Sequence, residues 1–242
     1  IASPTTAGQL EVSWTDASSN ESGFKIQRSA DGTTWTDLTS AGQNVTTITD
    51  INLPYNTKYY YQVAAYNGGQ TSAYVAASAP AYRYTLAEAP AVTCDKTAGT
   101  WYNTATFTFT NNAGGDATFG AGHLDHYHYL WNQTATNTQA EIEAGTAWST
   151  GTLALNATAD GDWYLHLVAH NTDNVANPTL FNSSAYKYDA TLPPAVTTLA
   201  TTLTGSVTNT TSIPLTWTAV TDALSGTAYY RVYRSTTSGT LG

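Results

Sequence analysis

Short segments in which apolar and polar residues alternate are the feature that most constrains the fold of this chain. LEVSW (residues 10–14) and GFKIQRS (residues 23–29) place every second side chain on the same face. Turn-forming pairs such as Asp31-Gly32 separate segments of this kind. Charged residues make up only 10% of the chain, so little of it is suited to a highly charged surface. These patterns predict an all-β chain built from short strands, as in a β-sandwich.

One short sequence motif, called here the repeated phrase, occurs near both ends of the sequence. LEVSW ends at Trp14, IPLTW ends at Trp217, and the two tryptophans are 203 residues apart. Each phrase is followed by a segment with an aromatic residue, an aliphatic residue and Arg-Ser at the same spacing, FKIQRS (24–29) and YRVYRS (230–235). Since one sandwich of this kind has about 100 residues, the offset leaves room for one further module between two copies.

We therefore predict three modules, at residues 1–85, 92–192 and 197–242. The segments between them contain proline, TLAEAPAV (85–92) and TLPPAV (191–196), and we expect semi-rigid spacers there. The first module is expected to lack part of its first strand, and the third to be incomplete. The sequence is accordingly interpreted as a piece of a longer repeat protein.

The same alternation predicts the core. In the outer modules, each repeated tryptophan is expected to be buried against the aromatic and aliphatic residues of the Arg-Ser strand. Arg28 is expected to point outward at the end of its strand, with Asp16 or Glu21 as a local partner. The single cysteine, Cys94, allows no intrachain disulfide and is expected to be buried. The predicted core residues are Trp14, Phe24, Ile26, Trp131, Trp163, Trp217, Tyr230 and Val232.

Several longer segments carry a resemblance to known families. Residues 10–85, with WTDASSNESGFKIQRSADG and YNTKYYYQVAAYN, resemble a bacterial fibronectin type III domain, and residues 199–239 resemble the start of another. Residues 92–192, with WYNTATFTF, HYHYLWN and DGDWYLHLVAHNTDNVAN, resemble the Ig-like repeats found between such modules in large prokaryotic cell-surface proteins. The resemblance implies tandem Ig-like and fibronectin type III β-sandwiches, the last one incomplete. It does not specify a function, because this architecture supports many unrelated roles.

All five histidines lie in the middle module, at His123, His126, His128, His166 and His170. Alternation places the second and third on one face of a predicted strand, and the last two on the corresponding face of another. These strands are expected to be neighbours in an Ig-like sandwich, so four imidazoles would share one outer face. Imidazole binds Zn, Cu or Ni, but closed metal sites usually need a fixed ligand spacing and carboxylates that support the ligands. We expect a polar surface with at least two of the four exposed, and neither a metal nor a cofactor.

Signals for catalysis are missing from the sequence. It contains no Gly-x-Ser-x-Gly nucleophile motif, and tandem sandwiches are not expected to place two carboxylates across a cleft. Asp160 and Asp162 precede a predicted strand and are interpreted as turn residues rather than Ca²⁺ ligands. We predict that the chain is not an enzyme and has no catalytic residues.

Charge and glycosylation motifs limit the partners. A net charge of −9 argues against nucleic acid and against anionic membranes, and no apolar run is long enough to enter a bilayer. The Asn-x-Ser/Thr motif makes six asparagines candidate glycosylation sites in a secreted protein. They are Asn20, Asn44, Asn132, Asn156, Asn182 and Asn209.

The favoured function is a structural segment of a long extracellular repeat protein, such as a surface filament, sheath, S-layer or adhesin stalk. Its expected partners are copies of itself, other surface proteins or glycans at the cell surface. The alternative is an accessory spacer or carbohydrate-binding region of a secreted polysaccharide-degrading enzyme. Carbohydrate binding would need exposed aromatic side chains, for which Trp35 and Trp148 are the candidates.

Overall fold

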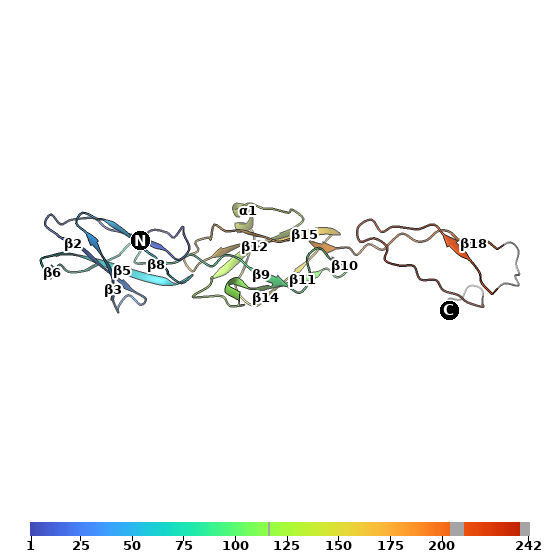
Figure 1. The fold of residues 1–242 in the computed structure, drawn as a ribbon, viewed down its shortest axis with the longest axis horizontal. Helices are drawn as coiled ribbons and strands as arrows, with labels where there is room; N and C mark the ends of the chain where they lie inside the picture. Colours follow the sequence, from blue (N-terminus) through green and yellow to red (C-terminus); the bar gives the residue numbers. More distant parts are fainter. Residues whose placement is uncertain (116, 204–210, 238–242) are drawn as a thin grey trace.

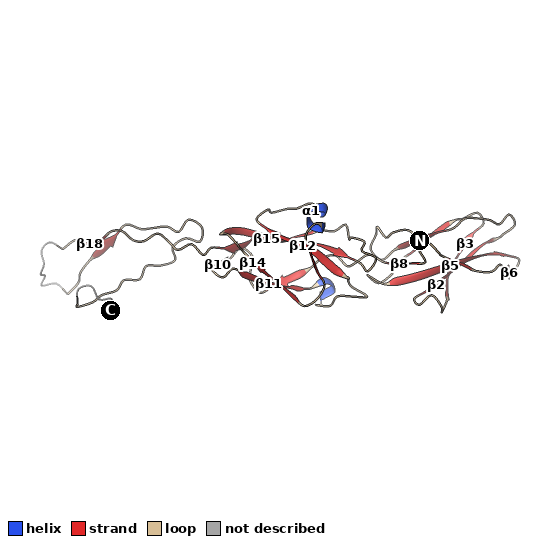
Figure 2. Ribbon diagram, turned by 180° about the vertical axis from the view of Figure 1, so that it is seen from behind, coloured by secondary structure: helices blue, strands red, loops and turns tan. Residues whose placement is uncertain are grey.

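The computed structural model describes residues 1–115, 117–203 and 211–237. Figure 1 shows an elongated molecule in which three parts lie end to end in chain order. Strands account for nearly all of its regular structure (Figure 2), and the described helices are α1 (Gln139–Glu143) and one 3₁₀ turn (Ala113–Gly115). The prediction of an all-β fold is confirmed.

The first part consists of two antiparallel sheets. One sheet pairs β1 (Leu10–Ser13) with β4 (Thr47–Asp50). The other has the order β3-β2-β5, and three short strands pair with further stretches of β5. The strands of this second sheet are β2 (Gly23–Ser29), β3 (Thr36–Gly42), β5 (Lys58–Asn67), β6 (Gln70–Thr71), β7 (Val75–Ala76) and β8 (Tyr82–Tyr84).

Alternating residues of both sheets meet in one core. Leu10 and Val12 of β1 and Phe24 and Ile26 of β2 are all buried in it. Two sheets that face each other across such a core form the sandwich architecture shared by immunoglobulin and fibronectin type III domains. Trp14 contacts Phe24, with 5.4 Å between ring centroids, but is only half-buried. The expectation of full burial is wrong because Trp14 lines a groove of about 790 Å³ that is open to solvent.

Arg28 has a different partner from the one expected. Its Nη1 donates to both carboxylate oxygens of Asp50 on β4, at 3.2 and 3.0 Å. The same buried carboxylate accepts a hydrogen bond from the Tyr61 hydroxyl at 2.7 Å. The prediction of an outward Arg28 is wrong, because alternation along β2 puts Arg28 on the inner face with Phe24 and Ile26. From there the guanidinium reaches the opposite sheet.

The second part is also a two-sheet sandwich. One sheet has the order β14-β11-β9 and the other β10-β17-β15-β12-β13, in which β10 and β17 run parallel. The first sheet contains β9 (Val92–Cys94), β11 (Thr106–Asn111) and β14 (Thr152–Asn156). The second sheet contains β10 (Trp101–Tyr102), β12 (His126–Asn132), β13 (Thr146–Trp148), β15 (Gly161–His170), β16 (Phe181–Asn182) and β17 (Tyr186–Tyr188).

Aromatic rings fill the core of this second sandwich. Phe107 and Phe109 of β11 are fully buried against the inner face of the other sheet. Trp163 is buried there, and Trp131 stacks on it at 5.4 Å between ring centroids. Trp131 itself is only half-buried, not buried as predicted, and it donates from Nε1 to the carbonyl of Asn156 at 3.1 Å. The thiol of Cys94 is half-buried at the same core, where burial raises its pKa.

A short helix covers the outer face of β12 and β15. Helix α1 begins after Thr138, whose side chain accepts from the Glu141 amide while the Glu141 carboxylate accepts from the Thr138 amide. This reciprocal capping satisfies two backbone donors at the helix start. Ile142, a residue of the helix itself, is fully buried. The helix was not predicted, although the Thr-x-x-Glu spacing at residues 138–141 is its sequence signal.

The third part contains one small sheet among its described residues, β18 (Leu199–Thr201) paired with β19 (Leu215–Trp217). Trp217 is half-buried against Tyr230, with 5.4 Å between ring centroids. Val232 is 54% exposed, so its predicted burial is wrong. In the described part of residues 197–237, no second sheet faces Val232 to exclude water from it.

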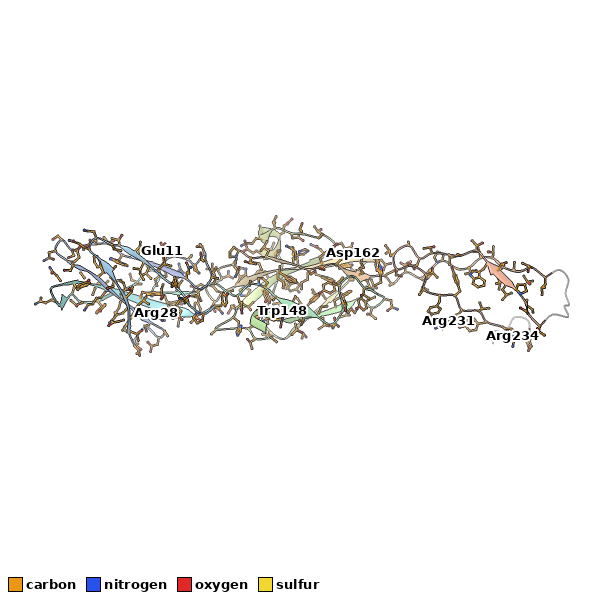
Figure 3. All side chains as sticks on the ribbon, in the orientation of Figure 1. Glu11, Arg28, Trp148, Asp162, Arg231 and Arg234 are labelled. Carbon is orange, nitrogen blue, oxygen red and sulfur yellow. The ribbon has the colours of Figure 1, made fainter. Side chains whose placement is uncertain are left out.

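The two copies of the repeated phrase therefore have different structures. Arg28 lies in the first part and Arg234 near the opposite end of the molecule (Figure 3). The first copy is strand β2, whereas residues 230–235 have no strand assignment. A strand needs a hydrogen-bonded neighbour, and the described residues around the second copy do not supply one.

Candidate functional site: the joint between the first two parts

The segment that connects the first two parts is buried between them. Thr85, Leu86 and Ala87 are all almost inaccessible to solvent. The Thr85 hydroxyl donates to the carbonyl of Pro54 at 2.6 Å. On the other side, the amide of Glu88 donates to the carbonyl of His123 at 2.8 Å. The connection is thus held on both sides, and is more restrained than proline content alone implies.

Asn56 supplies the contact from the first part. It lies in a turn with a φ of 39°, a conformation that asparagine tolerates better than most residues, and is fully buried. Its Nδ2 donates to the carbonyl of Gly120 at 3.0 Å. Its Oδ1 accepts from the amide and the hydroxyl of Thr172, at 2.8 and 2.9 Å. One side chain of the first part therefore bonds two separate loops of the second.

Asn171 supplies the reciprocal contact from the second part. It follows directly after β15, and its Nδ2 donates to the carbonyls of Thr85 at 2.9 Å and Tyr84 at 3.3 Å. Its Oδ1 accepts from the amide of Val175 at 2.8 Å, which closes the loop that presents it. Asn171 is fully buried, and both the nitrogen and the oxygen of its side-chain amide have hydrogen-bond partners within the protein, as buried polar groups normally do.

Two further residues of the same loop complete the joint. Asn177 is buried and donates from Nδ2 to the carbonyl of Ala87 at 2.7 Å. Asp173 accepts from the amide of Tyr84 at 2.9 Å and lies 3.8 Å from the Arg83 guanidinium. Hydrogen bonds are directional, so this set fixes the orientation of the two sandwiches as well as their distance.

The sequence signal for this joint lies in the HNTDNVAN stretch, residues 170–177. There the alternation of β15 stops and asparagines become frequent. The sequence alone did not assign these asparagines a role, because their partners are backbone carbonyls at residues 84–87, whose proximity only the fold creates.

The joint between the second and third parts is smaller and acidic. Asp189 is buried and its Oδ2 accepts from the amide of Ser225 at 3.1 Å. The nearby Asp222 is also buried and accepts from the same amide at 3.2 Å. The hydrogen bond from the Ser225 side chain is the main cause of a lowered pKa at Asp189. Asp160, interpreted as a turn residue, accepts from the amide of Ala190 at 2.8 Å beside this joint.

The histidines occupy the expected strands. β12 and β15 are paired neighbours, and His126 lies directly opposite His170 in the register. The expectation that at least two of the four are exposed is wrong, because His166 and His170 are buried and the other two are half-buried. Helix α1 and the segment that leads into it cover this face of the sheet.

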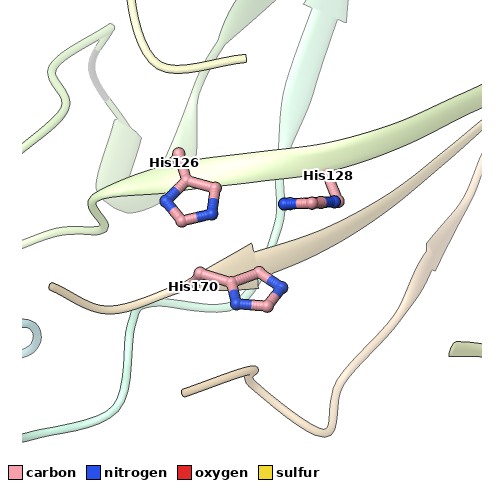
Figure 4. A group of neighbouring side chains, drawn as sticks. All are labelled: His126, His128 and His170. Carbon is pink, nitrogen blue, oxygen red and sulfur yellow. The ribbon is translucent and has the colours of Figure 1, made fainter. Parts of the chain in front are cut away.

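The four imidazoles separate into a group of three and one further residue. The Nδ1 of His166 lies 2.5 Å from Oδ1 of Asn182, and its Nε2 lies 2.9 Å from the carbonyl of Thr134, so both nitrogens are engaged. His126, His128 and His170 instead face one another, with ring centroids 4.8 to 5.3 Å apart (Figure 4).

The candidate glycosylation sites differ in accessibility. Asn132 is half-buried, and its Nδ2 donates to Oδ1 of Asn137 at 3.1 Å, so a glycan there would displace a hydrogen bond. Asn209 lies outside the described residues. The exposed candidates are Asn20, Asn44, Asn156 and Asn182.

Comparisons with known proteins concern the fold alone. No model of a protein family matches the chain, and no curated protein sequence matches it. A two-domain fibronectin type III segment of chicken tenascin aligns at 12% identity over 76% of this chain and 95% of that one, with a TM-score of 0.48. The FN1–FN3 domains of chicken CNTN1 align at 14% identity over 77% and 69%, with a TM-score of 0.28. The all-β fold is therefore assigned from the strands and sheets of this chain itself.

Proposed function

We propose that this chain is a non-catalytic structural segment of a long extracellular repeat protein, of the filament, sheath, S-layer or adhesin-stalk type. The observation that carries the proposal is the joint between the first two parts. A connection that only tethers two sandwiches can stay flexible. Here three buried asparagines and a buried connecting segment hold the sandwiches end to end, as a stiff rod requires.

The partners proposed for such a rod are further copies of the chain, other surface proteins or glycans. Low charge and exposed asparagine motifs are compatible with an extracellular surface. Among the described residues, none of the helices has the length and apolar character to cross a membrane.

The alternative, a spacer or carbohydrate-binding region of a secreted polysaccharide-degrading enzyme, has less support. Sugar-binding surfaces present exposed aromatic rings, but Trp148 is buried and Trp35 is half-buried. Trp148 packs within the second sandwich, where its Nε1 donates to the carbonyl of Thr150 at 3.0 Å. These two tryptophans therefore do not support the alternative.

Small-angle X-ray scattering of the whole chain tests the proposal. We expect the first two parts to scatter as one rigid body, and the double variant Asn56→Ala, Asn171→Ala to scatter as two bodies with a broader distribution of distances. Asn20→Ala, a change at an exposed asparagine of the first part, is the matched control. Wild-type scattering that already requires freely moving sandwiches would contradict a rod.

A further inference from the structure

Three imidazoles from two neighbouring strands meet on the covered face of the second sandwich. His126 and His128 come from β12, and His170 is the last residue of β15. One nitrogen from each ring can be chosen so that all three atoms lie within 4.8 Å of one another. Figure 4 shows the three rings close together, and the rings of His126 and His170 are stacked nearly parallel. The cluster is distinct from the asparagine joint, although Asn171 follows directly after His170.

Hydrogen bonds fix which nitrogen of two of these rings is free. Nδ1 of His126 lies 2.8 Å from Oδ2 of Asp125, and Nδ1 of His128 lies 2.8 Å from the main-chain carbonyl of Glu143 in α1. A carboxylate and a carbonyl only accept, so each Nδ1 carries the proton in the neutral ring. The Nε2 lone pairs of both rings are then available. Metal-binding histidines are oriented by this arrangement of a carboxylate or carbonyl behind the ring.

His170 has no comparable partner. It is 5% exposed, and within the described residues neither of its ring nitrogens makes a hydrogen bond. Buried polar atoms without a partner are rare in folded proteins, and a bound ion is one way in which such atoms are satisfied.

We infer that His126, His128 and His170 form a binding site for a divalent transition-metal ion, with Zn²⁺ as the best-suited ion. Three nitrogen ligands and a fourth position for water are a recurrent Zn²⁺ coordination set. Zn–N bonds of about 2.0–2.1 Å in a tetrahedron place the nitrogens about 3.3 Å apart. Side-chain rotations would have to bring the nitrogens from the present limit of 4.8 Å to that spacing, because the rings of His126 and His170 are now stacked at an interplanar angle of 12°. Ca²⁺ and Mg²⁺ are excluded as preferred ions because they select oxygen ligands.

The ion would join β12 to β15 immediately beside the joint. The amide of Asp125 donates to the carbonyl of His170 at 2.8 Å. The Asp125 carboxylate also lies 3.4 Å from the Thr172 hydroxyl, which donates to Asn56 of the first part. Metal binding would therefore stabilise the end of β15 from which the joint loop 171–177 starts.

Isothermal titration of the whole, tag-free chain with ZnCl₂ tests this inference. We expect one equivalent of Zn²⁺ to bind with a micromolar or lower Kd. Binding should be lost or weakened by at least about tenfold in His170→Gln, and by about tenfold in Asp125→Asn, which removes a supporting group. With Co²⁺ as the probe, a visible absorption band typical of tetrahedral coordination should appear in the wild type and be absent from His170→Gln.

Two controls keep the test decisive if His170→Gln folds poorly. His128→Gln removes a half-buried ligand and should cause the same loss, with folding checked by circular dichroism. His123→Gln changes a histidine of the same sandwich outside the cluster and should bind Zn²⁺ as the wild type does. The inference is overturned if the wild type binds no Zn²⁺, or if His128→Gln, correctly folded, binds it with unchanged affinity.

Discussion

The side-chain amide of Asn171 donates a hydrogen bond to the main-chain carbonyl of Thr85 at 2.9 Å, although the two residues are 86 positions apart in the chain. Both residues are fully buried, so neither group can exchange its partner for water. A buried hydrogen bond between a loop of one sandwich and the connecting segment of another couples the stability of the loop to the position of its neighbour.

Asn171→Ala should loosen the joint. The change leaves the buried carbonyl of Thr85 without this partner, and an unsatisfied buried group costs about 1–3 kcal/mol. We expect a lower melting temperature and faster amide exchange at Glu88, whose amide bonds across the joint. Exchange rates at Glu88 equal to those of the wild type would show that the joint does not depend on Asn171.

Tyr61→Phe should destabilise the first sandwich. It removes the hydroxyl that donates to the buried Asp50 carboxylate at 2.7 Å, and a hydrogen bond to a charged group is worth about 1.5–3 kcal/mol. Burial and this carboxylate also raise the pKa of Tyr61, so its phenol stays protonated in alkaline solution. Urea unfolding measures the loss, with Tyr66→Phe on the same strand as the control. Equal effects of the two changes would rule out a special role for Asp50.

Thr138→Ala should weaken helix α1 without affecting the sandwich core. The change removes the capping side chain of the helix, which typically costs about 0.5–2 kcal/mol. Faster exchange of the Ile142 amide, which donates to the Thr138 carbonyl, would report the loss. Thr136→Ala, at an exposed threonine of the same segment, should leave that exchange unchanged.

Acid should release the joint between the second and third parts. Hydrogen bonds from Ser225 lower the pKa of Asp189 in the folded state. A group with a lowered pKa contributes stability above its unfolded pKa, about 3.9 for aspartate, and loses it as the pH falls through the folded value. We expect amide exchange at Ser225, corrected for its intrinsic pH dependence, to accelerate below about pH 4. In Asp189→Asn this acid-dependent acceleration should be smaller, with Asp222 left as the remaining acidic acceptor of the Ser225 amide.

The strands were largely predictable because alternation is a local property. Phe24 and Ile26 point inward for the same reason that Lys25 points outward, and each can be assigned from its neighbours in sequence. The pairing of β12 with β15 followed from the expected sandwich. Arg28 shows where local patterning stops being enough: its position on the inner face follows from alternation, but its partner Asp50 could be found only on the opposite sheet.

By itself, the sequence determined that this chain is all-β, where most of its strands run and which faces of them are apolar. Only the tertiary structure decided which polar groups meet. Asn56 and Asn171 have no local signal of their partners, because a hydrogen bond depends on distances set by distant segments. Val232 shows the same difference between sequence and tertiary structure. Its side chain is apolar, but burying it would require a second sheet that faces it. Hydrophobic patterning is local and repetitive, whereas polar recognition is directional and is fixed only when the sheets and loops have come together.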